Sequence, residues 1–370
     1  MTTDSRFSTI EADGIALTLD LDGGMIRKLV ISREGRQIEP LHAAPWLDEC
    51  EVQNDESMPP HLRALAGDFF CAPFGLNDVE PAPMHGWPAN GFWKPVEQRR
   101  LSGGSSACFV LDRPVLGARL EKTLTLRDGH PFVYQSHVFI GGSGTITAAH
   151  HAMTRMPRGG RLSFSPKAYA ATPPVPLEPD PANGRFTLLY PAQTADLGAV
   201  PLAGGGTADI RDYPVADQSE DFIMLVEAPG SRLGWAAALR RGSHDLVLSL
   251  KDPAVLPLTL LWMSNGGRDY PPWNGRHTGV LGMEEARCYS SLGHAASVAD
   301  NPLRQSGIPT SFELGRPLEI RTVLGGVPMP PDWSEITDVE ISTEGLRIRD
   351  RSGAAMTVNY DATFLQTAEA

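Results

Sequence analysis

The sequence predicts an all-β protein built from many short strands, and three observations support this. Gly (37 residues) and Pro (32 residues) are both abundant in the 370-residue chain, and both favour turns over long regular elements. Segments in which apolar and polar residues alternate recur along the chain, as half-buried strands require. Long helical spacings are scarce. Large all-β architectures reach this length as one unit, so we expect a single domain over residues 1–370.

The first strands are expected close to the N-terminus. "GIALTLDLDGG" (14–24) alternates and ends in a Gly-Gly turn, and "MIRKLVIS" (25–32) and "EGRQIEPL" (34–41) continue the pattern. A short helix is expected in "PPHLRALAG" (59–67). The apolar segment "GDFFCAPFG" (67–75), which lies between glycines, predicts a buried strand or a tight turn beside one.

The clearest strand pattern lies between residues 118 and 154. "ARLEKTLTL" (118–126) and "PFVYQSHVFI" (131–140) are joined by a turn at Asp128-Gly129, and "TITAAHHAMT" (145–154) follows a Gly-rich turn. These three strands are expected to form a meander. The Pro-, Ala- and Gly-rich residues 171–215 predict long surface excursions.

The rest of the chain predicts further strands and a terminal hairpin. No repeat of fixed period is present, which argues against solenoids and propellers. Residues from about 327 to 370 are expected to form a C-terminal hairpin extension that turns at "RDRSG" (349–353). The other strands are expected at 221–228, 232–240, 244–251, 257–264, 278–289 and 312–326.

Composition excludes several classes of partner. The net charge of −12 and the pI of about 5.3 argue against binding to nucleic acid. No segment approaches the ~18 consecutive apolar residues of a membrane helix, and the N-terminus has no secretory signal pattern. The four cysteines are widely scattered, so we expect reduced thiols in a cytoplasmic protein.

Two irregular stretches are rich in aromatic residues. In "MHGWPANGFW" (84–93), His85 lies among three aromatic rings, with glycines and a proline that prevent regular structure. The second stretch is "NGGRDYPPWNGRH" (265–277). Segments that place this much apolar surface on irregular backbone usually line a pocket.

A histidine pair and a glutamate pair are the other candidates for chemistry. His150 and His151 are sequential on an expected strand, so their side chains point to opposite faces. The face that carries Thr145, Thr147 and His151 is the more polar, which favours His151 as the pocket residue; a structural histidine is the alternative.

The glutamate pair follows the same alternation. "GVLGM" (279–283) leads into Glu284, so its carboxyl group is expected at the end of a buried strand, where burial raises the pKa of a carboxyl group toward the range of a base at neutral pH. An exposed edge residue or an ion pair is the alternative.

Together these segments resemble the aldose 1-epimerase (galactose mutarotase-like) superfamily, and its hexose-6-phosphate mutarotase branch most closely. "GDFFCAPFG" followed by "HGWPANGFW" resembles that branch's Gly-rich turn and the "HGFAR" segment after it. "AAHHAM" (148–153) and "GVLGMEE" (279–285) resemble the family strands that carry a histidine and the catalytic glutamate, and "ELGRPLEIRT" (313–322) resembles its closing element. The resemblance covers residues 20 to 325 and implies a large antiparallel β-sandwich.

The resemblance also implies an activity, the interconversion of the α and β anomers of a sugar. His85 would hold the sugar near its ring oxygen, His151 would protonate that oxygen, and Glu284 would remove the proton of the anomeric hydroxyl. The reaction needs neither a metal nor a cofactor, and the expected partner is a monosaccharide or a related sugar.

The family's "HGFAR" arginine, which in the sugar-phosphate branch would help to hold the substrate, is replaced by Ala89, and Arg63, Arg155 or Arg276 could take its place. Aromatic rings can stack on sugar faces, and Arg, Asn and Asp can bond to hydroxyl groups. The candidates are Asn77, Asp78, Trp87, Arg63, Arg155, Trp273, Asn274 and Arg276.

Three other functions compete with this interpretation. The first is a non-catalytic carbohydrate-binding protein on the same fold. The second is a metal-dependent, cupin-like enzyme that uses His61, His85 and His151. The third is a glycoside hydrolase or lyase, which would need a second carboxylate near Glu284; Glu285 points the wrong way for this.

Overall fold

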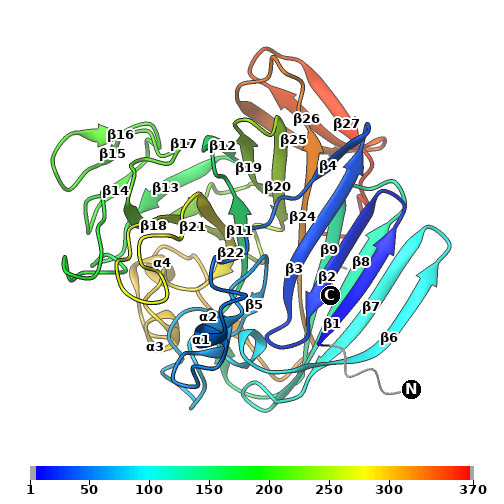
Figure 1. Ribbon diagram of the computed structural model, residues 1–370, viewed down its shortest axis with the longest axis horizontal. Coiled ribbons are helices and arrows are strands. Elements are labelled where there is room, and N and C mark those ends of the chain that lie inside the picture. The colour runs from blue at the N-terminus through cyan, green and yellow to red at the C-terminus, as the bar shows by residue number, and fades with distance from the viewer. Residues whose placement is uncertain (1–5, 367–370) are drawn as a thin grey trace.

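The computed structural model describes residues 6–366, and its sheets are built from antiparallel strands, which confirms the predicted all-β sandwich (Figure 1). The largest sheet has nine strands. In spatial order they are β17 (Asp212–Tyr213), β12 (Gly160–Phe164), β19 (Gly234–Arg240), β20 (Asp245–Lys251), β24 (Leu318–Pro328), β9 (Phe132–Gly141), β8 (Ala118–Arg127), β7 (Gly104–Leu111) and β6 (Trp93–Leu101).

A seven-stranded sheet packs against one part of the nine-stranded sheet. Its strands, in spatial order, are β14 (Gln193–Thr194), β13 (Lys167–Ala171), β18 (Ser219–Glu227), β21 (Leu258–Asn265), β22 (Val280–Arg287), β11 (Ala148–Arg155) and β5 (Phe70–Cys71). Both faces of this sheet are covered, so its strands are apolar on both sides. On β18, for example, Ile223 packs between the two sheets, whereas Phe222 packs on the outer face.

A four-stranded sheet covers another part of the same inner face (Figure 1). Its strands are β1 (Phe7–Ala12), β2 (Ile15–Asp20), β3 (Met25–Arg33) and β4 (Arg36–Ile38). Alternation along β2 sends Ile15, Leu17 and Leu19 into the common core, as the sequence pattern predicted.

The remaining elements are short. Two small sheets have two strands each. One pairs β10 (Thr145–Ile146) with β23 (Phe312–Glu313), and the other pairs β15 (Val200–Pro201) with β16 (Thr207–Ala208). The helices are α1 (Cys50–Gln53), α2 (Pro60–Arg63), the 3₁₀ turn η1 (Trp87–Ala89), α3 (His294–Val298) and α4 (Pro302–Gln305). Among the described residues, no helix has the length and apolar character needed to cross a membrane.

The expected three-strand meander is wrong at its third strand. β8 and β9 pair as predicted, but β11 lies in the other sheet, between β22 and β5. The chain changes sheets after Ile146, where β10 pairs with β23. Because β11 is buried on both faces, its sequence does not distinguish which sheet it joins.

The C-terminal region forms more than the expected hairpin. The hairpin of β26 (Gly345–Asp350) and β27 (Ala355–Val358) turns at the predicted place, but β25 (Ile336–Ser342) pairs with its other edge. This three-stranded sheet covers the outer face of the nine-stranded sheet, where Leu246 and Leu248 pack against Leu346 and other residues of the extension. The outer face of the seven-stranded sheet is covered by loops and short helices instead, and a cavity opens there.

Candidate functional site

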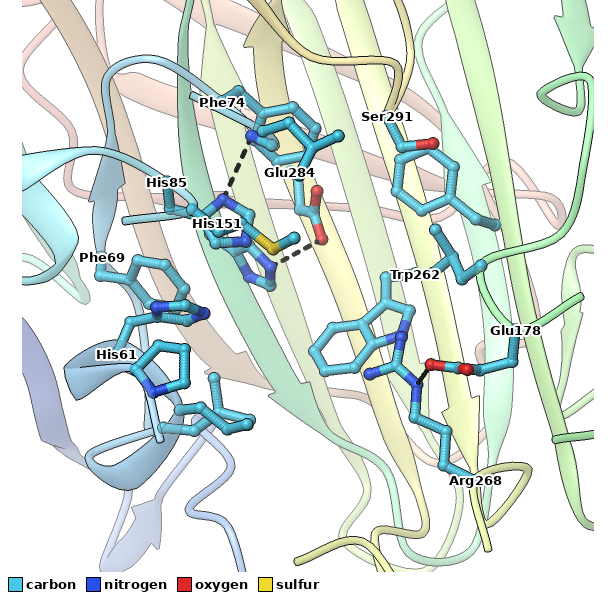
Figure 2. A pocket seen from close by; sticks show the side chains of 18 of the residues that line it. His61, Phe69, Phe74, His85, His151, Glu178, Trp262, Arg268, Glu284 and Ser291 are labelled. Carbon is cyan, nitrogen blue, oxygen red and sulfur yellow. Dashed lines mark hydrogen bonds and ion pairs between the residues drawn. The ribbon is translucent and has the colours of Figure 1, made fainter. Parts of the chain in front are cut away.

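A cavity of about 380 Å³ lies on the outer face of the seven-stranded sheet. Its floor is formed by β11, β18, β21 and β22, and its walls by the loops that contain both aromatic stretches. Histidines lie on one side of it, and an arginine and a glutamate face them from the other side (Figure 2). The polar lining residues are His61, His85, His151, Glu178, Arg268, Glu284 and Ser291.

Glu284 projects into the cavity from β22. Strand alternation directs it outward, while Glu285 points into the interior and pairs with Lys251 at 2.5 Å. The Glu284 side chain is only 1% exposed, and neither of its carboxyl oxygens has a hydrogen-bond partner among the described residues. Burial raises the pKa of Glu284 well above its usual value. A buried carboxyl group without partners is costly for the fold, so it suggests a functional role.

His151 lies directly beside Glu284. The two residues are paired in the register of β11 and β22, and His151 Nε2 is 3.3 Å from Glu284 Oε1. The imidazole stacks on Phe69, with ring centroids 4.5 Å apart. Burial lowers the pKa of His151 to about 4. Because burial disfavours both charges, the form in which Glu284 keeps its proton and His151 stays neutral is favoured over the ion pair.

The neighbouring histidine has a different environment. His150 points away from the cavity into the space between the sheets, where it contacts Phe70 and His137, and its Nδ1 is 3.9 Å from Asp68. Of the two sequential histidines, only His151 lines the cavity.

His85 completes the histidine side of the cavity. Both His85 and Gly86 have positive φ angles, 66° and 70°. A Cβ atom at Gly86 would lie 2.0 Å from the carbonyl oxygen of Ala72, so only glycine fits there. His85 Nδ1 accepts a hydrogen bond from Gly75 N at 3.3 Å, and burial lowers the pKa of His85. The neutral ring therefore carries its proton on Nε2, which can donate to a ligand.

Arg268 and Glu178 form the opposite wall. Arg268 Nε is 3.1 Å from Glu178 Oε1, and the guanidinium group lies 4.5 Å above the ring of Trp273. Tyr270 donates a hydrogen bond to the same Glu178 oxygen at 2.5 Å. Glu220 Oε1, in the floor, is 3.5 Å from Arg268 Nε, so two carboxylates compensate this cation.

Neither Arg268 nor Glu178 was predicted from the sequence as a site residue. Arg268 and Tyr270 lie within the aromatic stretch 265–277, which was the only available signal for them. Glu178 comes from the Pro-rich excursion, where nothing local distinguishes it from a surface residue.

Of the eight residues expected to contact the sugar in addition to the catalytic set, only Trp273 lines the cavity. Asn77 accepts a hydrogen bond from Glu80 N, and Asp78 accepts one from Ala295 N at the start of α3, so both hold turns. Trp87 packs beneath Arg113, 4.4 Å from its guanidinium group, and outside the cavity.

The other four residues also lie outside the lining of this cavity. Arg63 donates to the backbone of residues 53 and 55, and Arg276 pairs with Glu49. Arg155 and Arg276 line a separate surface groove, and Asn274 is an exposed turn residue with a φ angle of 44°. Turns and binding sites use the same residue types, so sequence alone could not separate them.

The positions of His61 and Glu178 concern the two other enzymes considered from the sequence, a metal-dependent cupin-like enzyme and a glycoside hydrolase or lyase. His61 Nδ1 bonds to Asn90 Oδ1 at 2.9 Å, and no group of three His, Cys, Asp or Glu residues within 6–366 is arranged to hold a metal ion. A second carboxylate, Glu178, does line the cavity, contrary to expectation, but it is engaged by Arg268 and Tyr270.

Comparison with known proteins identifies the fold. No protein-family model matches the sequence, and no curated protein matches it in sequence. Among solved structures, a provisionally named aldose 1-epimerase from Escherichia coli K12 is similar, with a TM-score of 0.56 and 14% identity over 87% of this chain and 99% of that one. A provisionally named mutarotase (YeaD) from Salmonella typhimurium gives a TM-score of 0.52 and 10% identity over 88% and 92% of the two chains.

A galactose mutarotase related enzyme from Lactobacillus acidophilus is also similar, with a TM-score of 0.50 and 11% identity over 87% of this chain and 98% of that one. At these identities the likeness is one of fold. The chain has the galactose mutarotase-like fold, as the resemblance in its sequence implied.

Proposed function

We propose that this protein is an aldose 1-epimerase-like enzyme, which interconverts the α and β anomers of a sugar by opening and closing its ring. The observation that carries the proposal is the contact between Glu284 and His151 in the cavity floor, 3.3 Å apart, with both Glu284 oxygens free of hydrogen bonds in the described chain. A cytoplasmic location is part of the proposal.

The reaction needs one proton removed and one proton supplied at neighbouring oxygens. Glu284 takes the proton of the anomeric hydroxyl while His151 donates a proton to the ring oxygen, and the bond between the anomeric carbon and the ring oxygen breaks. The product is the open-chain aldehyde. Rotation about the adjacent carbon–carbon bond and the reverse proton transfers close the ring as the other anomer. Each transfer contributes ~10²–10⁴-fold to the rate.

The shared proton of the pair suits this chemistry. The reactive form, with a carboxylate and an imidazolium, differs from the neutral form only by the shift of one proton from Glu284 Oε1 to His151 Nε2. After ring opening the proton that came from the sugar is on Glu284, and His151 is neutral. The pair therefore returns to its initial state on ring closure, without exchange with bulk water.

The remaining cavity residues would hold the sugar. His85 Nε2–H is available to donate near the ring oxygen, as the resemblance implies. Arg268 and Glu178, on the opposite wall, would bond to distant hydroxyl groups, and Trp262 and Trp273 offer aromatic faces.

The proposal is tested by following the optical rotation of freshly dissolved α-glucose and α-galactose with and without the protein. The wild type is expected to accelerate the relaxation, and Glu284→Gln should reduce the acceleration at least ~10²-fold. Glu49→Gln, at an exposed glutamate outside the cavity, is the matched control. Tight sugar binding without acceleration would favour the non-catalytic carbohydrate-binding alternative.

A further inference from the structure

A second cavity, of about 350 Å³, opens beside the first. None of its lining residues is charged. They are Tyr169, Ala171, Thr172, Pro173, Pro174, Pro191, Ala192, Gln193, Met224, Tyr289, Ser290, Leu292, Pro302 and Leu303.

The register of the seven-stranded sheet fixes the distance between the two cavities. Met224, in the second cavity, is paired with Leu260 on β21, and Leu260 is paired with Glu284 on β22. Met224 and Leu260 pack on the same outer face onto which Glu284 projects. Neighbouring strands lie ~4.8 Å apart, so Met224 is ~10 Å from Glu284 across the sheet. This is the length of two linked sugar rings.

Two chain segments contribute to both cavities. In the first, Pro173 and Pro174 line the second cavity, while Leu177 and Glu178 line the first. In the loop after β22, Ser291 lines the first cavity, and its neighbours Ser290 and Leu292 line the second. The two cavities are therefore neighbours on one face of the sheet, and both segments run along the boundary between them.

The second cavity has the chemistry of a site for an uncharged, amphipathic ligand. Tyr169 and Tyr289 are partly exposed and offer aromatic faces that also carry hydroxyl groups. The Ser290 residue is only 4% exposed, and its hydroxyl has no hydrogen-bond partner among the described residues. A buried hydroxyl group without a partner costs ~1–3 kcal/mol, and a ligand hydroxyl would remove that cost.

We propose that the second cavity binds the second glycosyl unit of a reducing disaccharide whose reducing unit lies over Glu284 and His151. This inference rests on the proposed function. Anomerisation requires only that the anomeric carbon of the reducing unit be free, so a second unit linked through a remote hydroxyl does not interfere with the chemistry.

The test compares glucose with maltose and cellobiose as substrates for catalysed anomerisation. For the wild type we expect KM to be ~10-fold lower for at least one disaccharide than for glucose, which corresponds to ~1.4 kcal/mol of added binding. Tyr289→Ala should remove this difference and leave KM and kcat for glucose unchanged. Tyr289→Phe, which keeps the ring, should retain most of the preference. Phe186→Ala is the control, at an exposed aromatic residue outside both cavities.

Several outcomes overturn the inference. It is wrong if neither disaccharide is preferred by the wild type, or if Tyr289→Ala changes the kinetics of glucose and disaccharide equally while the melting temperature is maintained. If no sugar is anomerised, the proposed function fails, and calorimetric titration of maltose and cellobiose into the wild type and Tyr289→Ala then decides the inference. Binding that the substitution weakens supports it, and no binding overturns it.

Discussion

The residue that most sets this molecule apart is Glu284, a carboxyl group buried without hydrogen bonds. Folding normally avoids such groups, because an unpaired buried carboxyl group loses its hydration with no compensation. Among the described residues, its ion-pair neighbour is His151, which is itself buried. The arrangement therefore lowers stability locally in exchange for a poised pair of proton carriers.

Glu284→Gln is expected to stabilise the protein at neutral pH. The pKa of Glu284 is raised in the folded state, so above the unfolded pKa folding is coupled to the uptake of a proton. The Glu284 contribution to stability is therefore full below the unfolded pKa of ~4.3 and is lost as the pH rises toward the folded pKa. Glutamine has no such dependence.

Thermal unfolding at pH 8 and pH 5 measures this effect. The variant should gain ~1–3 kcal/mol at pH 8 and less at pH 5. Destabilisation of the variant at pH 8 would mean that the folded protein uses Glu284 as a stabilising anion.

The pH dependence of kcat/KM should reflect the single proton of the Glu284–His151 pair. At low pH a second proton enters the pair, and because burial lowers the pKa of His151 to about 4, activity should persist down to that region. At high pH the remaining proton leaves. Because burial raises the pKa of Glu284, this limb should lie well above the ordinary carboxyl range. An acid limb centred near pH 6.5 would show a histidine with ordinary hydration and would contradict the account.

How far the sequence predicts the site depends on where each residue lies. His151 and Glu284 are on strands, where alternation determines which of two neighbours faces outward. Arg268 and Glu178 are on loops, whose paths depend on tertiary packing, and no local pattern brings them together.

Among the elements, β22 is held in place from behind the face that carries Glu284. Glu285, which follows Glu284, pairs with Lys251 on β20, and Lys251 also pairs with Glu227 on β18 at 3.1 Å. Lys251 is fully buried and donates to Thr259 Oγ1 at 2.9 Å. These contacts tie three strands of the seven-stranded sheet to β20 of the nine-stranded sheet, and they fix the position from which Glu284 projects.

Lys251→Met is expected to destabilise the protein by ~3–5 kcal/mol, because it leaves the buried carboxylate of Glu285 without its cation and leaves Glu227 with Lys167 alone. Denaturant unfolding measures the change. Lys28→Met removes an exposed partner of Glu39 and should cost only ~0–1 kcal/mol. Equal effects of the two substitutions would show that the buried cluster does not hold the sheets together.

For the elements, the sequence predicted the pairing of strands that are joined by a short turn. It did not predict the pairing of strands where the chain passes from one sheet to the other. The turn at Asp128-Gly129 correctly predicted the pairing of β8 with β9. β11 was assigned to the wrong neighbours because its pairing with β22 joins residues more than 120 positions apart. Strands β6 and β7 had no assigned pattern, since β6 is exposed along most of its length and contains Pro95.

In the whole molecule, each sheet face has a distinct role. The nine-stranded sheet is covered on one side by the seven- and four-stranded sheets and on the other by the three-stranded C-terminal sheet (Figure 1). The outer face of the seven-stranded sheet is instead covered by loops and short helices, and both cavities lie there. A stiff sheet thus carries the proposed catalytic pair, while the loops supply the residues that would select the sugar.

The most direct test of the account is a double-mutant cycle on catalysed anomerisation, with Glu284→Gln, His151→Asn and the two combined. If one shared proton links the residues, each single variant should lose nearly as much rate as the double variant, because neither residue works without the other. Independent losses that multiply in the double variant would contradict the account, as would full activity in either single variant.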